Sequence, residues 1–145
     1  MIDVIVVITL TLSISAYTPG ANAISGGSVM ANGQRPHWGA FACPSVIPLG
    51  SGVRLLGEAK KRADEMGLPT EGVCTDRFAR RYSSGHLDVC IPQRHWGMSN
   101  DERLKWAFAW GRRSGVVEFR LPPSAAIVRR SKDESDRHRN DGTHD

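Results

Sequence analysis

Two aspartates in the middle of the chain are candidates for acid–base chemistry. Asp76 follows the run Val73–Thr75, and Asp88 lies between Leu87 and Val89. On a strand, successive side chains point to opposite faces, so the Asp88 carboxyl faces away from its two apolar neighbours. One such carboxyl can act first as an acid and then as a base if burial or a nearby negative charge raises its pKa. The competing interpretation is that both aspartates are surface residues beside arginines.

The three cysteines flank the same region. Cys74 lies two residues before Asp76, and Cys90 lies two residues after Asp88. A spacing of two puts side chains on one face of a strand, so Cys43, Cys74 and Cys90 are expected to line one groove with the aspartates. A Cys43–Cys74 disulfide, with Cys90 as the leftover thiol, and three separate buried thiols are both open. Because no Cys-x-x-Cys or histidine spacing accompanies them, no metal site and no cofactor are expected.

Short strands separated by turns must position these residues. The alternating run from Thr9 to Tyr17 predicts a half-buried strand. The other five barrel strands are expected over 39–43, 53–56, 73–77, 86–91 and 116–121, and helices over 58–66 and 100–112. The short run over 29–33 is suited to a further small strand outside the barrel. Many short strands without a βαβ rhythm predict a mainly β protein, a small six-stranded barrel with one or two short helices.

The second helix carries the clearest local signals. Ser99 or Asn100 is expected to cap it, with acidic residues in its first turn. Its buried face is expected to consist of four residues at helical spacing, Leu104, Ala107, Phe108 and Gly111.

Size and composition limit the classes of protein to consider. The chain has 145 residues, of which 40% are hydrophobic and 23% charged, as in a single globular domain. The net charge of +4 is small for a nucleic-acid binder, so no nucleic-acid partner is expected. Residues 1–8 are either a strand extension or an apolar leader, and no stable membrane span is expected. The polar residues 122–145 are expected to form a disordered tail.

Four segments in order resemble the three-aspartate (3D) domain, a double-psi β-barrel family related to the membrane-bound lytic transglycosylases. The segments are Ser15-Ala-Tyr-Thr-Pro19, Val46-Ile-Pro-Leu-Gly-Ser51, Asp76 through Leu87-Asp88-Val89, and Ala109-Trp-Gly-Arg-Arg113 with the strand after it. The resemblance covers residues 9–121 and implies that they form a double-psi barrel. It also implies that Ala16–Pro19 belong to this domain and not to a cleaved leader.

The resemblance further implies a peptidoglycan-cleaving lytic transglycosylase, located in a cell envelope or outside the cell and encoded by a bacterium or a phage. Asp88 takes the position of the family's catalytic acid/base, and Asp76 that of its supporting aspartate. The family's first aspartate is Cys43 here, and its two glycines are Phe78 and Ala79. These departures favour the alternative, a non-catalytic glycan-binding or structural barrel of an envelope or virion assembly.

Peptidoglycan strands would meet a basic loop beside the aspartates. Arg77, Arg80 and Arg81 are expected at the rim of the site, where guanidinium groups bind the lactyl or peptide carboxylates. A solvated loop explains the same cluster. Three aromatic residues are candidates for stacking on sugar rings or, alternatively, for packing: Tyr82, Trp96 and Trp38. The sequence does not specify an oligomeric state.

Overall fold

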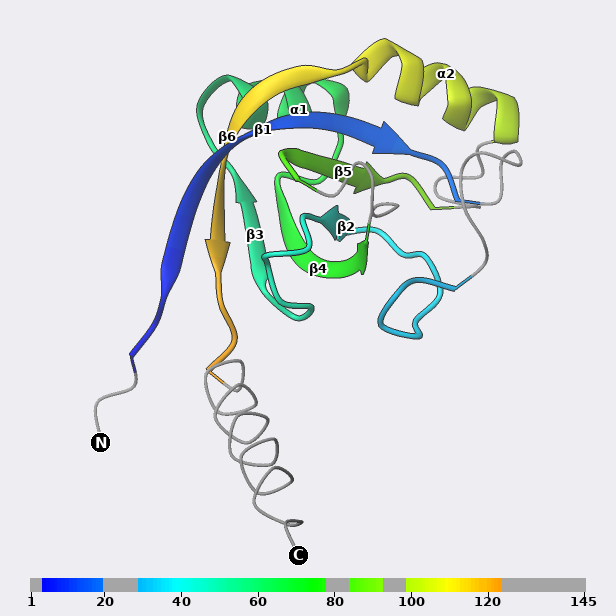
Figure 1. Cartoon of the computed structure of the whole chain (residues 1–145). Coiled ribbons are helices and arrows are strands. Elements are labelled where there is room, and N and C mark those ends of the chain that lie inside the picture. The colour runs from blue at the N-terminus through cyan, green and yellow to red at the C-terminus, as the bar shows by residue number, and fades with distance from the viewer. Residues whose placement is uncertain (1–3, 20–28, 78–83, 93–98, 124–145) are drawn as a thin grey trace, which may run out of the picture.

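In the described part of the chain, six strands close into a barrel, with two short helices beside it (Figure 1). The computed structural model describes residues 4–19, 29–77, 84–92 and 99–123. The elements are β1 (Val7–Tyr17), β2 (Ala40–Cys43), β3 (Gly52–Leu55), α1 (Gly57–Met66), β4 (Glu71–Arg77), β5 (His86–Cys90), α2 (Asn100–Trp110) and β6 (Arg113–Arg120). The mainly β, six-stranded barrel expected from the sequence is confirmed. The expected tail lies outside the described residues, apart from Pro122 and Pro123.

One expected strand is absent. Residues 29–33 form a turn in which the Gly33 N–H donates to the Met30 carbonyl at 2.9 Å. Gly33 adopts a φ of 86°, which glycine tolerates and most residues avoid. This left-handed residue ends the short apolar run before it can extend into a strand.

The order of strands around the barrel differs from their order in the chain. The order is β1-β5-β2-β4-β3-β6, and β6 closes onto β1. Two pairs are parallel, β1 with β5 and β2 with β4, and the other four are antiparallel. The strands that carry the two aspartates, β4 and β5, therefore lie on either side of β2.

Strand β1 has different partners along its length. Val7–Ile14 pairs with β6, whereas only Ser13–Tyr17 pairs with β5. In Figure 1, β1 is a long curved strand whose N-terminal half extends beyond the region where β5 flanks it. Closure of the barrel therefore depends on the C-terminal half of β1.

Alternating side chains fill the barrel. Leu12 and Ile14 of β1 are buried, as are Leu87 and Val89 of β5. They share one core with residues of the other strands and helices: Phe41, Cys43, Ile47, Val53, Leu55, Ala59, Ala63, Leu68, Cys74, Ile91, Trp110, Val117 and Phe119. The period-two pattern that predicted β1 thus reflects one apolar face turned into the barrel.

Helix α2 begins as expected but buries a different face. The Ser99 side chain accepts a hydrogen bond from the Glu102 N–H, which confirms the expected cap. The buried residues are Arg103 and Trp110, whereas Phe108 is 80% exposed. The buried face expected from apolar spacing was therefore largely wrong, because of its four residues only Ala107 packs against the core. The helix is turned so that two long side chains can reach main-chain carbonyls.

Two of those carbonyls lie just after β1 and β5, and the third lies within β1. The Arg103 guanidinium donates to Pro19 O at 3.2 Å and to Ile91 O at 3.0 Å. The Trp110 indole N–H donates to Ile14 O at 3.2 Å, at the point where β6 stops flanking β1. A leucine or phenylalanine at these positions would remove these side-chain donors, and the loss of a partner is costly for a buried carbonyl. Satisfying backbone polar groups therefore determines how α2 packs.

Candidate functional site

The strand register brings the two candidate aspartates into one row. Asp88 of β5 is paired with Ser15 of β1 on one side and with Ala42 of β2 on the other. Ala42 is also paired with Asp76 of β4. Residues directly opposite each other on paired strands project to the same face of the sheet. We call Ser15, Asp88, Ala42 and Asp76 the aspartate row.

The aspartate row lies on the outer face of the barrel wall. Leu87 and Val89 point into the core, so Asp88 between them points outward. Asp88 is half-buried, because neighbouring parts of the chain shelter this face. A small apolar cluster lies on the same side, formed by Met30, Ala40 and Cys90 with Tyr17 packed against them. The wall at Asp88 is therefore sheltered but still reached by solvent.

A β-bulge turns Asp76 toward this face. Phe41 is paired with Cys74, but the next residue, Ala42, is paired with Asp76, so Thr75 is the extra residue. Cys74 consequently points into the core while Asp76 points outward. The expectation that Cys74 shares a groove with Asp76 was wrong, because spacing by two holds only on a regular strand.

The cysteines separate into two environments. Cys43 and Cys74 form a disulfide inside the barrel core, with Cα atoms 5.7 Å apart. This is the pairing that the sequence left open beside three separate thiols. Cys90 is the free thiol. It lies on the outer face of β5, two residues after Asp88 and on the same side. Only one of the three cysteines therefore shares a face with the aspartates.

Asp88 has the environment that an acid near neutral pH requires. Burial raises its pKa to about 6, and the negative charge of Asp76 acts in the same direction. The Ser15 hydroxyl donates a hydrogen bond to Asp88 Oδ1, and this bond and the positive charge of Arg112 both act to lower the pKa. Burial is the largest of these effects. Among the described residues, no side chain forms an ion pair with Asp88.

Asp76 is held by three donors. The Tyr17 hydroxyl donates to Oδ2 at 3.0 Å, while the Ala31 N–H at 3.0 Å and the Arg77 N–H at 2.9 Å both donate to Oδ1. Two of the donors are main-chain groups, one of them in the turn at 29–33. The carboxyl of Asp76 is therefore fixed in orientation, with both of its oxygens engaged.

Tyr17 and Cys90 are neutral neighbours of this carboxyl. Burial raises the pKa of the Tyr17 hydroxyl, and the adjacent Cys90 and Asp76 raise it further. Burial also raises the pKa of the Cys90 thiol to about 12, although a hydrogen bond with Tyr17 opposes the shift. A thiol in this state is a poor nucleophile, since the thiolate is the reactive form. Cys90 therefore packs as a neutral thiol beside the aspartates.

The expected basic rim is represented by one described residue. Arg77 is half-buried, and its Nη1 donates to Pro44 O at 2.8 Å. Arg80, Arg81, Tyr82 and Trp96 lie outside the described residues. Trp38 stacks on Trp106 of α2, with ring centroids 6.4 Å apart.

Three residues of the site were not assigned a role from the sequence. Ser15 and Tyr17 lie within the alternating run, on the side opposite Ile14, so the pattern already placed them together on one face. The pattern did not predict that β1 pairs in parallel with β5. This pairing places Ser15 beside Asp88 and Tyr17 beside Cys90. Arg112 follows α2 and gave no local signal.

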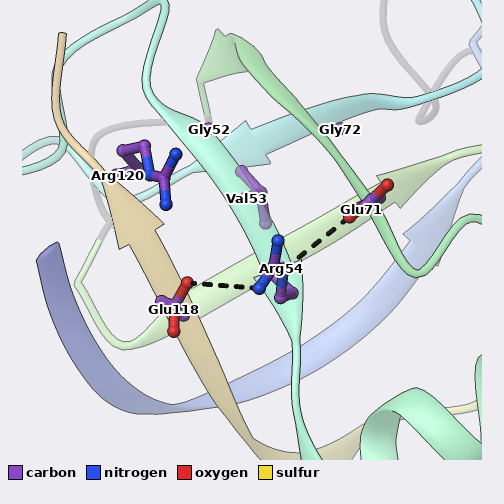
Figure 2. A pocket seen from close by; sticks show the side chains of 7 residues that line it. All are labelled: Gly52, Val53, Arg54, Glu71, Gly72, Glu118 and Arg120. Carbon is purple, nitrogen blue, oxygen red and sulfur yellow. Dashed lines mark ion pairs between the residues drawn. The ribbon is translucent and has the colours of Figure 1, made fainter.

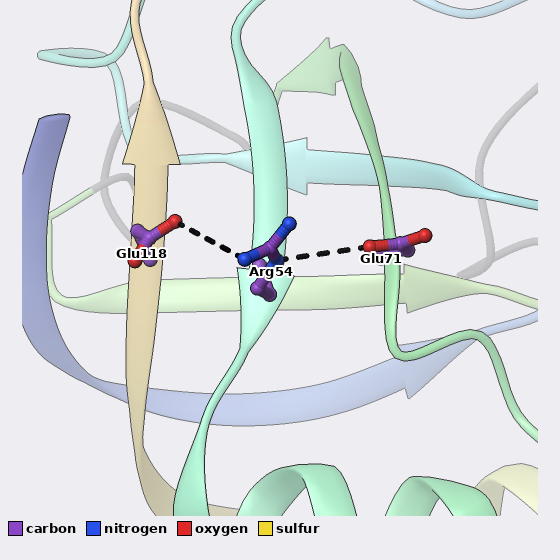
Figure 3. A network of polar contacts seen from close by, with 3 residues as sticks. All are labelled: Arg54, Glu71 and Glu118. Atoms are coloured by element: carbon purple, nitrogen blue, oxygen red, sulfur yellow. Dashed lines mark ion pairs between the residues drawn. The ribbon is translucent and has the colours of Figure 1, made fainter. Parts of the chain in front are cut away.

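Two hollows lie on other parts of the surface. The first, about 280 Å³, lies over β3, β4 and β6, where Figure 2 shows its lining side chains. Arg54 lies there between Glu71 at 3.7 Å and Glu118 at 4.0 Å (Figure 3). The pairs are largely solvent-exposed and contribute little to stability. The second hollow, about 520 Å³, lies against α1, and Trp110 and Arg62 are among its lining residues.

Within residues 4–19, 29–77, 84–92 and 99–123, no three His, Cys, Asp or Glu side chains are grouped so that they could hold a metal ion. Neither helix in these ranges is long and apolar enough to cross a membrane.

Comparisons with models of known protein families, with curated proteins and with solved structures found no match.

Proposed function

We propose that this protein is a lytic transglycosylase that cleaves the glycan strands of peptidoglycan, with Asp88 as its single general acid/base. The barrel would then be a double-psi barrel of the three-aspartate type. The observation that carries the proposal is the state of Asp88, a half-buried carboxyl whose pKa is raised to about 6 beside a second carboxyl on the same face. General acids of glycan-cleaving enzymes are carboxyls raised in this way.

The reaction needs one proton donated and one recovered. Protonated Asp88 donates its proton to the glycosidic oxygen, and the bond between that oxygen and the anomeric carbon breaks. That anomeric carbon belongs to a muramyl residue. The 6-hydroxyl oxygen of this muramyl residue then bonds to the anomeric carbon, and its proton goes to the Asp88 carboxylate. The product is a 1,6-anhydro sugar, no water is consumed, and Asp88 returns to its initial state. One carboxyl is sufficient, unlike in hydrolysis, where two carboxyls divide the work.

The neighbours of Asp88 suit both halves of this cycle. Burial and the charge of Asp76 favour the protonated form, which is needed first. The hydrogen bond from Ser15 and the positive charge of Arg112 favour the carboxylate, which is needed second. The opposing effects leave the pKa near 6, close to the pH of neutral solution, where a group can both give and take a proton.

Substrate binding is assigned to Arg77, at the end of β4, and to the residues that follow it in the sequence. In this proposal, Arg77, Arg80 and Arg81 bind carboxylates of the muramyl lactyl groups or stem peptides, and Tyr82 stacks on a sugar ring. A cell-envelope or extracellular location follows from the substrate, and the Cys43–Cys74 disulfide is consistent with an oxidising compartment.

One observation favours a second candidate, a non-catalytic glycan-binding barrel. Cys43 takes the position of the family's first aspartate, and its side chain is committed to a disulfide in the core. The chain therefore retains two of the family's three aspartates, Asp76 and Asp88. A binding module would retain the carboxyls as hydrogen-bond acceptors for sugar hydroxyls without transferring a proton.

The Asp88→Asn variant separates the two candidates. Full-length protein is incubated with isolated peptidoglycan, and released muropeptides are analysed by mass spectrometry. The wild type is expected to release 1,6-anhydro products, and Asp88→Asn is expected to release none while still co-sedimenting with peptidoglycan. Asp64→Asn, an exposed change on α1, is the matched control and retains activity. Wild-type protein that binds peptidoglycan but releases no such product would leave the binding module as the function.

A further inference from the structure

The N-terminal half of β1 has one free edge. Residues Val7–Leu12 pair with β6 on one side, but β5 begins to flank the other side only at Ser13. Figure 1 shows this half of the strand running away from β5 along the side of the barrel. The barrel is thus closed at one end of β1 and has an open strand edge at the other.

Hydrogen bonds at the two ends of this segment show which peptide groups face the edge. The Val6 carbonyl accepts from Leu121 N on the β6 side, and Ser13 N donates to Gly85 O on the β5 side. Because N–H and C=O groups alternate in direction along a strand, the groups of Val7, Thr9 and Thr11 point away from β6. Within the described part of the chain, no backbone group pairs with these three residues on that side.

Side-chain burial along β1 changes where β5 stops. Leu12 and Ile14 are 5% and 1% exposed, whereas Ile8 and Leu10, in the same inward row, are only half-buried. The residues before them are more exposed still, from 72% at Val4 through 59% at Ile5 to 47% at Val7. Apolar side chains are therefore left uncovered beside the same free edge.

This edge lacks the features that keep strand edges apart. Proteins commonly protect an edge with charged residues, proline or a bulge. Residues Val4–Leu12 contain no charged residue and no proline, and the pairing with β6 runs without a register shift. An uncharged edge can approach an identical edge without like-charge repulsion.

We propose that two copies of this chain associate through β1, edge to edge and antiparallel, about a two-fold axis at Thr9. In this register Val7 faces Thr11 of the second copy, Thr9 faces Thr9, and Thr11 faces Val7. All three are residues whose peptide groups point to the edge, so each facing pair exchanges two hydrogen bonds. The second copy also covers Ile8 and Leu10, which β5 leaves half-buried. The resulting interface is self-complementary, as a two-fold interface must be.

The first test is the oligomeric state of the full chain and of Thr9→Lys, measured by sedimentation velocity over a range of concentrations. The wild type is expected to dimerise as concentration rises. Thr9→Lys places two positive charges at the axis and is expected to weaken dimerisation at least tenfold. Within one chain residue 9 lies across from Glu118, so the lysine is compatible with the fold. Val46→Lys, an equal charge change at an exposed residue distant in sequence from this edge, is expected to dimerise like the wild type.

The second test identifies the surface directly. Hydrogen-bonded residues on antiparallel strands have Cα atoms about 5.5 Å apart, within disulfide range. Thr9→Cys is therefore expected to form a cross-linked dimer under mild oxidation, whereas Lys60→Cys on α1 is not. A wild type that stays monomeric at every concentration would overturn the proposal. The proposal would also be overturned if the wild type dimerised, Thr9→Lys dimerised equally well and Thr9→Cys formed no cross-link. The two copies would then associate through another surface or another extended segment. Neither result depends on glycan cleavage.

Discussion

Cys74 and Asp76 are two residues apart on β4, yet their side chains lie on opposite faces of the barrel wall. Thr75, the extra residue of the bulge, reverses the alternation between them. Cys74 is bonded to Cys43 in the core, while Asp76 accepts hydrogen bonds from Tyr17 on the outside. The disulfide and the aspartate row are therefore built on the two faces of one irregular strand.

The first prediction concerns the pH dependence of activity. Because the pKa of Asp88 is raised to about 6, its proton-donating form declines as pH rises through 6. The rate of 1,6-anhydro product release is therefore expected to fall about tenfold for each pH unit well above 6. Rates measured with the wild type between pH 4 and pH 8 check this. A loss of rate centred near pH 4, the ordinary value for an aspartate, would contradict the assigned role.

The second prediction concerns stability. The folded-state pKa of Asp88 lies above its unfolded value of about 3.9, so the folded state holds more protons between those pH values. Stability contributed by this group is therefore present below about pH 4 and is lost as pH rises through 6. At pH 7 Asp88→Asn is expected to be more stable than the wild type by on the order of 1–2 kcal/mol, discounted for partial solvent exposure.

Urea denaturation at pH 7 and at pH 3.5 measures this difference. The gain is expected to shrink at pH 3.5, where Asp88 is protonated in both states. Asp64→Asn, on the exposed surface of α1, is expected to change stability little at either pH. An Asp88→Asn variant that is less stable than the wild type at pH 7 would show that the carboxylate is favourably paired in the fold.

The third prediction concerns the core disulfide. Cys43 and Cys74 close a loop with a sequence separation of 31. Removing that constraint with Cys43→Ala and Cys74→Ala together is expected to destabilise the protein by about 3–4 kcal/mol in the chain-entropy description. Chemical denaturation of the double variant measures the loss. Adding a reductant should destabilise the wild type similarly and should not affect the double variant. A double variant as stable as the wild type would refute the prediction.

The sequence predicted the barrel strands well because its signals are local. Alternation identified β1. Other strands begin soon after a glycine or proline residue, as β3 does after Gly50 and β4 after Pro69. The outward direction of Asp88 followed from Leu87 and Val89 alone. These features require knowledge only of neighbouring residues, so the pattern was sufficient.

The missing strand at 29–33 has a local cause in Gly33, but the wrong prediction for Cys74 and Asp76 depends on residues distant in the chain. The bulge at Thr75 arises where β4 pairs with β2, so nothing near Cys74 indicated that Asp76 would face the other way. Similarly, the partner of Asp88 is Ser15, a residue 73 positions away in the sequence. Pairing across the barrel, rather than spacing along a strand, determines these contacts.

The last prediction concerns the buried cation of α2. Arg103 has no exposed surface and joins the main chain after β1 to the main chain after β5 by donating to Pro19 O and Ile91 O. Arg103→Met keeps much of the side-chain volume but removes these donors, so two buried carbonyls lose a partner. The expected loss of stability is about 3 kcal/mol or more, since each unsatisfied buried group costs about 1–3 kcal/mol. Lys105→Met, an exposed change on the same helix, is the control and is expected to change stability by less than about 0.5 kcal/mol. Urea denaturation of both variants measures the difference, and equal stabilities would show that the carbonyls find other donors.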